Sequence, residues 1–225
     1  MNKKERLKAK IEEFAKEDMC VAFSGGVDSG LLLKMACEAS SHTGKKVYAV
    51  TMDTVLHPQA DIEAAKAVAK ETGAETDAGI KNNPRERCYL CKKALYTKMK
   101  ELAREKNISV LIDGTNEDDL HVYRPGLKAV RELGVHTPLA ECGMTKKEVR
   151  ELAGEYGISV AERPSSPCLA TRLPYGAEID LTLLEKIDRG EEYLRSLGFG
   201  DVRLRVHGTI LRLEINPADF PRVLE

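Results

Sequence analysis

Residues 19–35 read Met-Cys-Val-Ala-Phe-Ser-Gly-Gly-Val-Asp-Ser-Gly-Leu-Leu-Leu-Lys-Met, and this stretch decides the fold. The apolar run 19–23 predicts a short buried strand, and the apolar residues from Leu31 onward predict a helix. Between them, Gly25 and Gly26 allow a tight turn in which the backbone can approach an anion closely. The free N–H groups and the dipole at the start of a helix also favour negative charge. We therefore expect a phosphate-binding turn between this strand and this helix.

The turn, residues 24–29, reads Ser-Gly-Gly-Val-Asp-Ser and resembles the PP-loop of the ATP pyrophosphatase superfamily. It lacks the Gly-Lys-Ser/Thr of a Walker loop and the G-x-G-x-x-G of a dinucleotide-binding fold. The resemblance implies that the turn binds the β- and γ-phosphates of ATP, so that the α-phosphate is attacked and pyrophosphate leaves. Asp28 would repel a phosphate unless a divalent metal such as Mg²⁺ lay between them. The residues expected to bind ATP and its metal here are Ser24, Gly25, Gly26, Val27, Asp28 and Ser29.

The composition is that of a soluble globular protein. The 225 residues are 42% hydrophobic and 32% charged, which suits one large domain or a nucleotide-binding domain with a smaller appendage. No apolar run is long enough for a membrane span, and the N-terminus Met-Asn-Lys-Lys-Glu-Arg lacks a signal-peptide core, so we expect a cytoplasmic protein. The net charge of −1 argues against nucleic acid as the main partner.

Predicted helices and strands alternate through the first half of the chain. The helices are expected at 3–18, 29–40, 61–72 and 88–106, and the strands after the first at 45–53, 76–80 and 109–113. This alternation is typical of an α/β fold with a doubly wound parallel sheet, whose ligands bind at the carboxyl ends of the strands. Residues 51–53 and 113–116 are polar and lie at such ends. The further residues expected to bind ATP are Met52, Asp53, Gly114 and Thr115.

Two shorter elements are expected beyond this region. Leu139 and Ala140 predict one more short strand. Residues 145–156 predict a helix, in which Thr145 as N-cap and Glu148 three residues later form a capping box.

A loop-like stretch with three prolines, residues 163–175, indicates a domain junction. We therefore expect an ATP-binding domain over 1–163 and a smaller C-terminal α/β domain over 164–225. The elements predicted in the C-terminal domain are a helix at 180–197, strands at 201–207 and 209–215, and a helix from 218.

Cys88 and Cys91 form a C-x-x-C motif, and Cys168 lies in the proline-rich loop. The pair could simply share one helical face, with one cysteine in the core. A redox dithiol is possible, although the context is not thioredoxin-like, and a zinc site would need a second C-x-x-C or an H-x-x-x-H that the chain lacks. Three thiolates would hold an iron–sulfur cluster with one open iron, if folding brings Cys168 to the pair. Cys20 and Cys37 lie in apolar stretches and are read as packing residues.

Further motifs narrow the resemblance to one family. They are Asn83-Pro84-x-x-Arg87-Cys88-Tyr89-x-Cys91-Lys92, Asp113-Gly114-Thr115-Asn116, Arg124-Pro125-Gly126 and Pro164-Ser165-Ser166-Pro167-Cys168-Leu169-Ala170-Thr171-Arg172-x-Pro174-Tyr175. Together they resemble the LarE family, the pyridinium-3,5-biscarboxylic acid mononucleotide sulfurtransferases, which help to make the nickel-pincer nucleotide cofactor of lactate racemase. The likeness spans residues 19 to about 215.

The resemblance implies a reaction in which a substrate carboxylate is adenylated and sulfur then displaces AMP. Some members of the family sacrifice the sulfur of one cysteine, at the position of Cys168. Others hold a 4Fe–4S cluster on three cysteines, whose open iron carries the transferred sulfide. Cysteine occupies all three positions here, at 88, 91 and 168, which favours the cluster type. The family also implies a homo-oligomer and a supply of sulfide or a sulfur-donor protein.

Arg203 and Arg205 alternate on one face of a predicted strand and could clamp the phosphate or second carboxylate of the substrate. Resemblance places Glu191 or Glu192 in the substrate region, and we name Glu192. The candidate catalytic residues are thus Asp28, Cys168, Glu192, Arg203 and Arg205. The alternative is that these charges in the C-terminal domain are merely solvated. Two other functions stay open at this point: tRNA thiolation by a PP-loop enzyme, and ATP binding without turnover in a protein with structural zinc.

Overall fold

A computed structural model of the protein describes residues 1–51, 87–163, 167–177 and 179–223. The described residues up to 163 form one compact unit, and those from 167 onward form a second. The helix predicted at 61–72 and the strand predicted at 76–80 lie outside the described residues. No helix in the described parts of the chain is long and apolar enough to cross a membrane.

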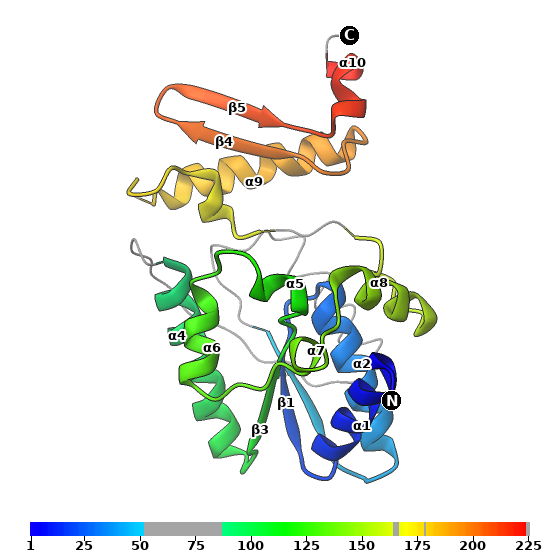
Figure 1. The fold of residues 1–225 in the computed structure, drawn as a ribbon. Helices are drawn as coiled ribbons and strands as arrows, with labels where there is room; N and C mark the ends of the chain where they lie inside the picture. The colour runs from blue at the N-terminus through cyan, green and yellow to red at the C-terminus, as the bar shows by residue number, and fades with distance from the viewer. Residues whose placement is uncertain (52–86, 164–166, 178, 224–225) are drawn as a thin grey trace. The chain divides into compact units, whose positions relative to one another are not determined.

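The first unit is built on a parallel sheet, whose described strands run in the order β2-β1-β3 (Figure 1). The strands are β1 (Met19–Ala22), β2 (Val47–Val50) and β3 (Val110–Asp113). Ala22 pairs with both Val50 and Asp113, so the three strands end level with one another. The polar residues that follow them consequently lie at one edge of the sheet, where open α/β folds bind ligands. The predicted α/β fold with a parallel sheet is confirmed.

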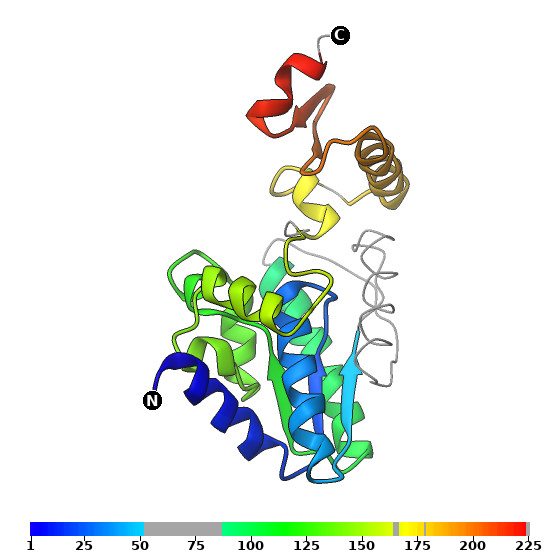
Figure 2. The ribbon, with the colours of Figure 1, turned by 90° about the vertical axis from the view of Figure 1, so that its right-hand side faces the viewer.

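Helices cover both faces of this sheet (Figures 1 and 2). Their bounds are α1 (Lys3–Phe14), α2 (Val27–Ser41) and α8 (Lys146–Glu155) on one face, and α4 (Arg87–Glu105) and α6 (Gly126–Glu132) on the other. Successive residues of β1 alternate between the two cores. Met19 and Val21 join the core with α1, α2 and α8, whereas Cys20 and Ala22 join the core with α4 and α6. A strand that is buried on both faces needs a continuous apolar run, which residues 19–23 provide.

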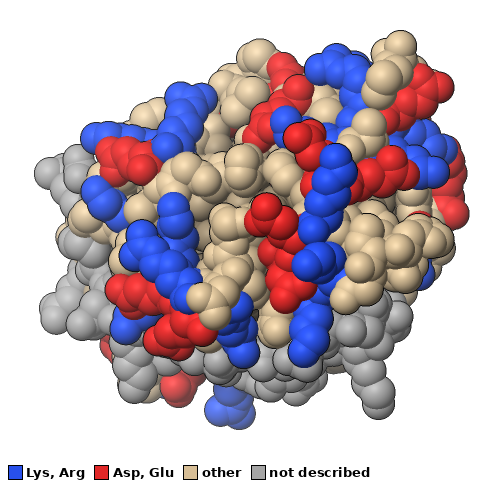
Figure 3. All heavy atoms as spheres, turned by 90° about the horizontal axis from the view of Figure 1, so that it is seen from below, with Lys and Arg blue, Asp and Glu red and all other residues tan. Residues whose placement is uncertain are grey.

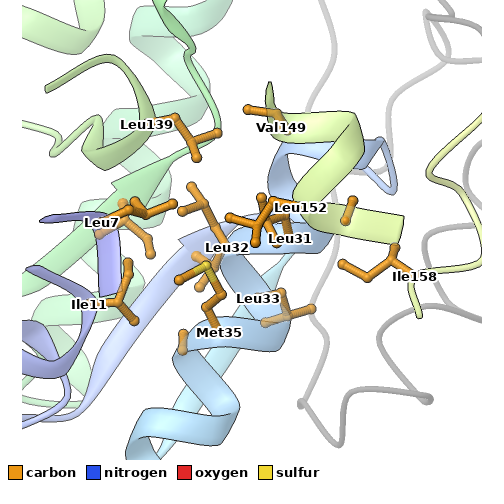
Figure 4. Close-up of a cluster of buried hydrophobic side chains, with 14 of the residues drawn as sticks. Leu7, Ile11, Leu31, Leu32, Leu33, Met35, Leu139, Val149, Leu152 and Ile158 are labelled. Carbon is orange, nitrogen blue, oxygen red and sulfur yellow. The ribbon is translucent and has the colours of Figure 1, made fainter. Parts of the chain in front are cut away.

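The larger core lies around α2 (Figure 4). Leu31, Leu32 and Leu33 are consecutive, yet all three are fully buried, because α2 packs against β1, α1 and α8 together. Side chains from the neighbouring helices complete this core: Leu7, Ile11, Leu139, Val149 and Leu152. Full burial of a leucine stabilises a fold by about 1.5–3 kcal/mol, so this cluster anchors the helix that carries the phosphate-binding turn.

The N-terminal helix α1 is attached to its neighbours by both apolar and charged contacts. Asn2 and Glu5 form a capping box at its start. Lys3 pairs with Glu148 of α8 at 2.9 Å, on the exposed side of the helix. Figure 3 shows that basic and acidic side chains are interspersed on the lower face of the molecule rather than gathered by sign.

The segment between β3 and α8 contains the short helices α5 (Glu117–Leu120) and α7 (Pro138–Glu141) on either side of α6. The predicted strand at Leu139 and Ala140 is wrong, because both residues belong to α7. Pro138 has a fixed φ and no N–H group, so it starts a helix readily and cannot donate to a strand ladder. Besides its ladder with β1, β3 makes one isolated parallel bridge in the described residues, between Ile112 and His136 of this segment.

The second unit packs a helix against a two-stranded antiparallel ribbon. Its elements are the 3-10 turn η1 (Leu169–Arg172), α9 (Leu181–Ser196), β4 (Arg203–His207), β5 (Ile210–Glu214), η2 (Pro217–Asp219) and α10 (Phe220–Val223). Leu204 and Val206 of β4 face the small apolar core around Leu184 and Ile187 of α9. Gly190 of α9 lies under Leu204, whose Cδ1 would be only 2.7 Å from an added Cβ. The absence of a side chain at 190 therefore lets the helix and β4 approach closely.

Candidate active site

The predicted phosphate-binding turn connects β1 to α2. Gly25 has a φ of 73°, a left-handed conformation that glycine adopts without strain. Gly26 is the N-cap of α2, and no described side chain caps the helix there. Ser29 Oγ accepts a hydrogen bond from the Ser24 N–H at 3.3 Å and donates to the Gly26 carbonyl at 3.1 Å. The turn is thus braced by a serine hydroxyl, while the first N–H groups of α2 remain suited to bind a phosphate.

Gly114, which directly follows β3, packs against this turn. A Cβ at residue 114 would lie 3.0 Å from the Ser29 nitrogen and 3.2 Å from Asp28 Cβ. Those distances are tighter than ordinary contacts, so a side chain here would require the start of α2 to shift by a few tenths of an ångström, and glycine lets β3 and α2 approach without strain. Thr115, the other residue predicted at this strand end, is buried and donates through its N–H to Asp113 at 2.8 Å. The structure therefore places the predicted residues Gly114 and Thr115 beside the PP-loop.

Asp28, the predicted metal-binding carboxylate, has two partners from distant parts of the chain. Its Oδ1 accepts a hydrogen bond from Asn116 Nδ2 at 3.0 Å, and its Oδ2 forms an ion pair with Lys146. Asn116 is the buried N-cap of α5, and Lys146 is the first residue of α8. The capping box of Thr145 and Glu148 is present as predicted and sets the position of Lys146. Sequence reasoning missed Lys146, because nothing local indicates a partner 118 residues away.

A buried network around Asp113 connects this edge of the sheet to α4. Tyr96 of α4 donates to Asp113, and Lys92 Nζ lies 3.4 Å from the same carboxylate. Burial opposes ionisation of Asp113, but the Lys92 charge and the bonds from Thr115 and Tyr96 outweigh it and hold the pKa below its usual range. Burial and the neighbouring Asp113 charge raise the pKa of Tyr96 well above its usual value, so Tyr96 remains a proton donor. An ionised carboxylate consequently fixes α4 beside the end of β3.

The two cysteines of the C-x-x-C motif lie on the first turn of α4. Cys88 is exposed and Cys91 is half-buried, and their spacing of three residues places them on one side of the helix. Tyr89 donates to Glu132 of α6 at 2.7 Å. Gly126, at the start of α6, lies so close that an added Cβ would be 3.3 Å from the Cys88 carbonyl oxygen. The turn that carries both thiols is therefore fixed on α6.

Three other cysteines belong to apolar cores, as the sequence predicts for Cys20 and Cys37. Burial raises the pKa of Cys20 to about 11, so its thiol stays protonated at neutral pH. Burial also raises the pKa of Cys37 and of Cys142. A raised thiol pKa disfavours both nucleophilic attack and metal ligation, which require the thiolate.

In the second unit, Cys168 immediately precedes the 3-10 turn η1 and is half-buried. Its carbonyl oxygen accepts hydrogen bonds from the N–H and from the hydroxyl of Thr171, at 2.9 and 2.8 Å. Arg172 is 1% exposed and forms a two-pronged ion pair with Glu191, at 2.7 and 2.8 Å. A buried arginine therefore lies four residues after the cysteine, and although the sequence motif contains it, it was not among the predicted site residues.

The two predicted arginines of β4 lie on the face of the ribbon opposite the apolar core. Arg205 Nη1 donates to the Thr171 carbonyl at 2.6 Å, and its Nε lies 2.8 Å from Glu214. Arg203 pairs with Asp201 at 3.3 Å. Glu192, the predicted acidic residue, is exposed, whereas the neighbouring Glu191 is buried and holds Arg172. The structure thus associates Arg205 with the Cys168 turn and places Glu192 at the surface.

Some predicted residues cannot be compared with the structure. Met52 and Asp53 lie outside the described residues. Cys88 and Cys91 belong to the first unit and Cys168 to the second. Within the described residues, no group of three or more Cys, His, Asp or Glu side chains is arranged so that it could hold a metal ion.

Comparisons with known proteins agree with the turn at residues 24–29. Residues 1–123 match the family model of a PP-loop domain. The chain is 35% identical over 225 residues to the pyridinium-3,5-bisthiocarboxylic acid mononucleotide synthase of Lactiplantibacillus plantarum, covering 96% of this chain and 80% of that protein.

Two uncharacterized proteins show similar likeness. One from Synechocystis is 36% identical over 214 residues, covering 91% of this chain and 79% of its own length. One from Methanocaldococcus jannaschii is 34% identical over 204 residues, covering 91% and 80%. The PP-loop match spans more than half of the chain, and the identity to the Lactiplantibacillus plantarum protein extends through both units. The chain belongs to the PP-loop family of ATP-binding proteins and, within it, to the LarE family.

Proposed function

We propose that the protein is an ATP-dependent sulfurtransferase that acts on pyridinium-3,5-biscarboxylic acid mononucleotide. It adenylates a carboxylate of this substrate and replaces AMP by sulfur, which yields a thiocarboxylate for nickel-pincer nucleotide biosynthesis. The proposal is carried by the PP-loop at residues 24–29, in a chain 35% identical to a synthase of the corresponding bisthiocarboxylic acid. The ATP-binding domain would comprise residues 1–163, and residues 164–225 would form the substrate and sulfur-transfer domain.

The ligand of the PP-loop is ATP with Mg²⁺, as its family implies. In the adenylation step, a carboxylate oxygen of the substrate bonds to the α-phosphorus while the bond to the pyrophosphate oxygen breaks. The N–H groups at the start of α2 and Mg²⁺ held by Asp28 would stabilise the negative charge of the departing pyrophosphate. Adenylation is needed because a carboxylate has no good leaving group until AMP supplies one.

Lys146 has a role in this step that follows from its contact with Asp28. Both Lys146 and a metal ion would bind the same carboxylate. Lys146 would therefore release Asp28 where that carboxylate holds Mg²⁺, and its ammonium group would be free to bind a phosphate oxygen. Asn116 would keep Asp28 oriented throughout, because its own position is fixed as the N-cap of α5.

We propose that Cys88, Cys91 and Cys168 hold a 4Fe–4S cluster, which when bound would supply the sulfide that displaces AMP. Thiolates are the usual ligands of such clusters. Two of the three thiols lie on one turn of α4, which is fixed on α6, and this arrangement suits shared ligation. As the carbon–sulfur bond to hydrosulfide forms, the bond between the acyl carbon and the AMP oxygen would break. AMP would leave, and the proton of the hydrosulfide would pass to solvent.

Arg203 and Arg205 would bind the phosphate or second carboxylate of the nucleotide substrate, since an arginine guanidinium matches both anions. Glu192 would contribute to the same region from the exposed side of α9. The sulfur would come from sulfide or a sulfur-donor protein, and the enzyme would work as a homo-oligomer in the cytoplasm. Nucleic acid is not the proposed substrate, because the net charge of −1 provides no general attraction to a polyanion.

The test begins with protein purified without oxygen. Iron, acid-labile sulfide and zinc would be measured together with the visible spectrum, for the wild type and for Cys88→Ala, Cys91→Ala and Cys168→Ala. Cys37→Ala is the matched control, because Cys37 is half-buried in α2 and is read as a packing residue. We expect about four irons per chain, lost in the three variants and retained in the control.

A second measurement follows turnover directly. Pyrophosphate release and the mass of the nucleotide product would be recorded with the biscarboxylic acid mononucleotide, and in parallel with unmodified tRNA. Thiocarboxylate formation with the mononucleotide supports the proposal, whereas activity with tRNA alone would contradict it. If the protein contains no iron and Cys168 becomes dehydroalanine, the sulfur comes from Cys168 itself and the proposed cluster is wrong. Stoichiometric zinc with no turnover would identify a structural site instead.

A further inference from the structure

We infer that Arg172 and Glu191 are positioning residues that hold the Cys168 turn in a fixed relation to the arginines of β4. This inference rests on the proposed function, because it concerns the cysteine and the anion-binding arginines assigned there. All of the contacts involved lie within the second unit. Neither residue would touch the substrate or the transferred sulfur.

Arg172 binds the chain on both sides of Cys168. Its Nη1 donates to the carbonyl of Pro167 at 3.1 Å and to the hydroxyl of Thr171 at 3.0 Å. The Thr171 hydroxyl in turn donates to the carbonyl of Cys168 at 2.8 Å. A single guanidinium nitrogen therefore restrains the residue before the cysteine and, through Thr171, the cysteine itself.

Glu191 fixes that guanidinium from α9. Its two oxygens accept from Arg172 Nε and Nη2 at 2.7 and 2.8 Å, an arrangement that defines the orientation of the planar group. Both side chains are at most 1% exposed. Because separating a buried ion pair leaves an uncompensated charge, this pair does not exchange partners easily.

The same carboxylate also sets the position of β4. Glu191 Oε1 accepts a hydrogen bond from the Leu204 N–H at 2.9 Å, and Leu204 lies between Arg203 and Arg205. Arg205 then returns to the Cys168 turn, since its Nη1 donates to the Thr171 carbonyl at 2.6 Å. The contacts form a closed ring that runs from the cysteine turn through Glu191 to β4 and back.

This closed ring explains why a charged pair lies in a small apolar core. Two apolar residues would pack between α9 and the turn but would not orient the turn, whereas the ion pair specifies both distance and angle. In an enzyme, a misplacement of about 1 Å can lower a rate by about 10²-fold. The ring would therefore keep the sulfur site at Cys168 aligned with the anion held by Arg203 and Arg205.

Arg172→Lys is the variant to test, and Arg195→Lys is its matched control. Arg195 also donates to Glu191, at 2.9 Å, from a position one turn later on α9. Both variants replace an arginine that binds Glu191 by lysine, so the positive charge is kept in each. Thr171→Val serves as a second variant, because it removes the hydroxyl contact and leaves the ion pair intact.

We expect Arg172→Lys to lower thiocarboxylate formation by about 10–100-fold while pyrophosphate release stays within about twofold of the wild type. Thr171→Val should also lower thiocarboxylate formation more than pyrophosphate release, but by a smaller factor. Arg195→Lys should leave the ratio of the two activities unchanged. If both activities fell by one common factor, or if Arg172→Lys and Arg195→Lys behaved alike, the pair would be merely structural and the inference would be wrong.

A measurement that needs no substrate separates this inference from the proposed function. The metal-free full-length chain would be labelled with iodoacetamide, and the rates at Cys168 and Cys88 compared by peptide mass. A loosened turn should expose Cys168, so Arg172→Lys should raise the Cys168-to-Cys88 rate ratio at least about threefold, with the ratio unchanged in Arg195→Lys. An unchanged ratio in Arg172→Lys overturns the inference. If Arg172→Lys raised the Cys168-to-Cys88 rate ratio but the wild type released no pyrophosphate, the inference would stand and the proposed function would be wrong.

Discussion

The two units hold their key carboxylates in opposite ways. In the PP-loop, Asp28 pairs with Lys146 near the surface, where the side chains are 19% and 32% exposed. In the second unit, Glu191 pairs with Arg172 with almost no exposure. A partly exposed pair can exchange one cation for another at little cost, whereas a buried pair cannot. The first arrangement suits a site where a metal must enter, and the second suits a site whose geometry must not change.

The largest effect expected from this comparison concerns stability in the second unit. Glu191→Ala leaves the Arg172 guanidinium buried without its partner, so we expect the free energy of unfolding to fall by about 3–5 kcal/mol. Urea denaturation followed by circular dichroism measures it. Glu192→Ala is the control. Because Glu192 is exposed, this substitution should change the free energy of unfolding by no more than about 0.5 kcal/mol. Equal losses in the two variants would contradict the assignment of Glu191 as the residue that fixes the turn.

The next effect tests the close approach of β3 to the PP-loop. Gly114→Ala would place a Cβ 3.0 Å from the Ser29 nitrogen, so we expect a loss of about 1–3 kcal/mol together with weaker ATP binding. Gly154→Ala, at an exposed position in the last turn of α8, meets nothing within 4 Å and should stabilise the protein by about 0.5–1 kcal/mol. Thermal unfolding and ATP titration measure both variants, and the two substitutions should have opposite signs.

A smaller change in stability is expected at the exchangeable pair itself. Lys146→Met should alter the free energy of unfolding by less than about 1 kcal/mol, because the pair is partly exposed to solvent. Pyrophosphate release should nevertheless fall by about tenfold or more, since a hydrogen bond to a charged phosphate would be lost. The control is Lys147→Met. The ammonium group of Lys147 is exposed and lies 3.9 Å from Glu151, so this ion pair is weak. If Lys147→Met lost as much activity, the role proposed for Lys146 would not stand.

The smallest effect concerns pH. Hydrogen bonds from the Thr145 N–H and from Lys3 lower the pKa of Glu148 from 4.5 to about 2. Its folded-state pKa is depressed, so its contribution is present above about pH 4.5 and is lost as the pH falls towards 2. Glu148→Gln should therefore be less stable than the wild type by under about 1 kcal/mol at pH 7, and the difference should disappear in acid. Unfolding curves at both pH values, with Glu151→Gln as a control, measure this.

Local patterns in the sequence predicted the parts of the fold that depend on neighbouring residues. The strand–turn–helix at 19–35 and the capping box of Thr145 and Glu148 both follow from a few adjacent side chains, and both are present. The strand expected at Leu139 and Ala140 was wrong, because two apolar residues carry no period and Pro138 favours a helix start. The partnership of Asp28 with Lys146 depends on how α8 packs against α2, which no local pattern encodes.

The identity of the buried glutamate was within reach of sequence reasoning. On the predicted helix at 180–197, Leu184 and Ile187 mark the apolar face, and Glu191 follows them at spacings of seven and four residues. A carboxylate within an apolar stripe requires a buried partner, whereas Glu192 lies on the solvent side. Helical spacing could thus have favoured Glu191 over Glu192. The partner, Arg172, could be found only from the folded unit, because it lies in a turn outside the helix.

Glycine at 190 and glutamate at 191 have a joint consequence for redesign of this enzyme. The glycine lets β4 lie against α9, and the glutamate then fastens the backbone of that strand at Leu204. The ribbon is therefore held in place by contacts between β4 and α9, and β5 takes no part in them. Exposed positions of β5, such as Ile210 and Leu211, could be varied while these contacts stay intact. The same helix would then support ribbons with different outer surfaces.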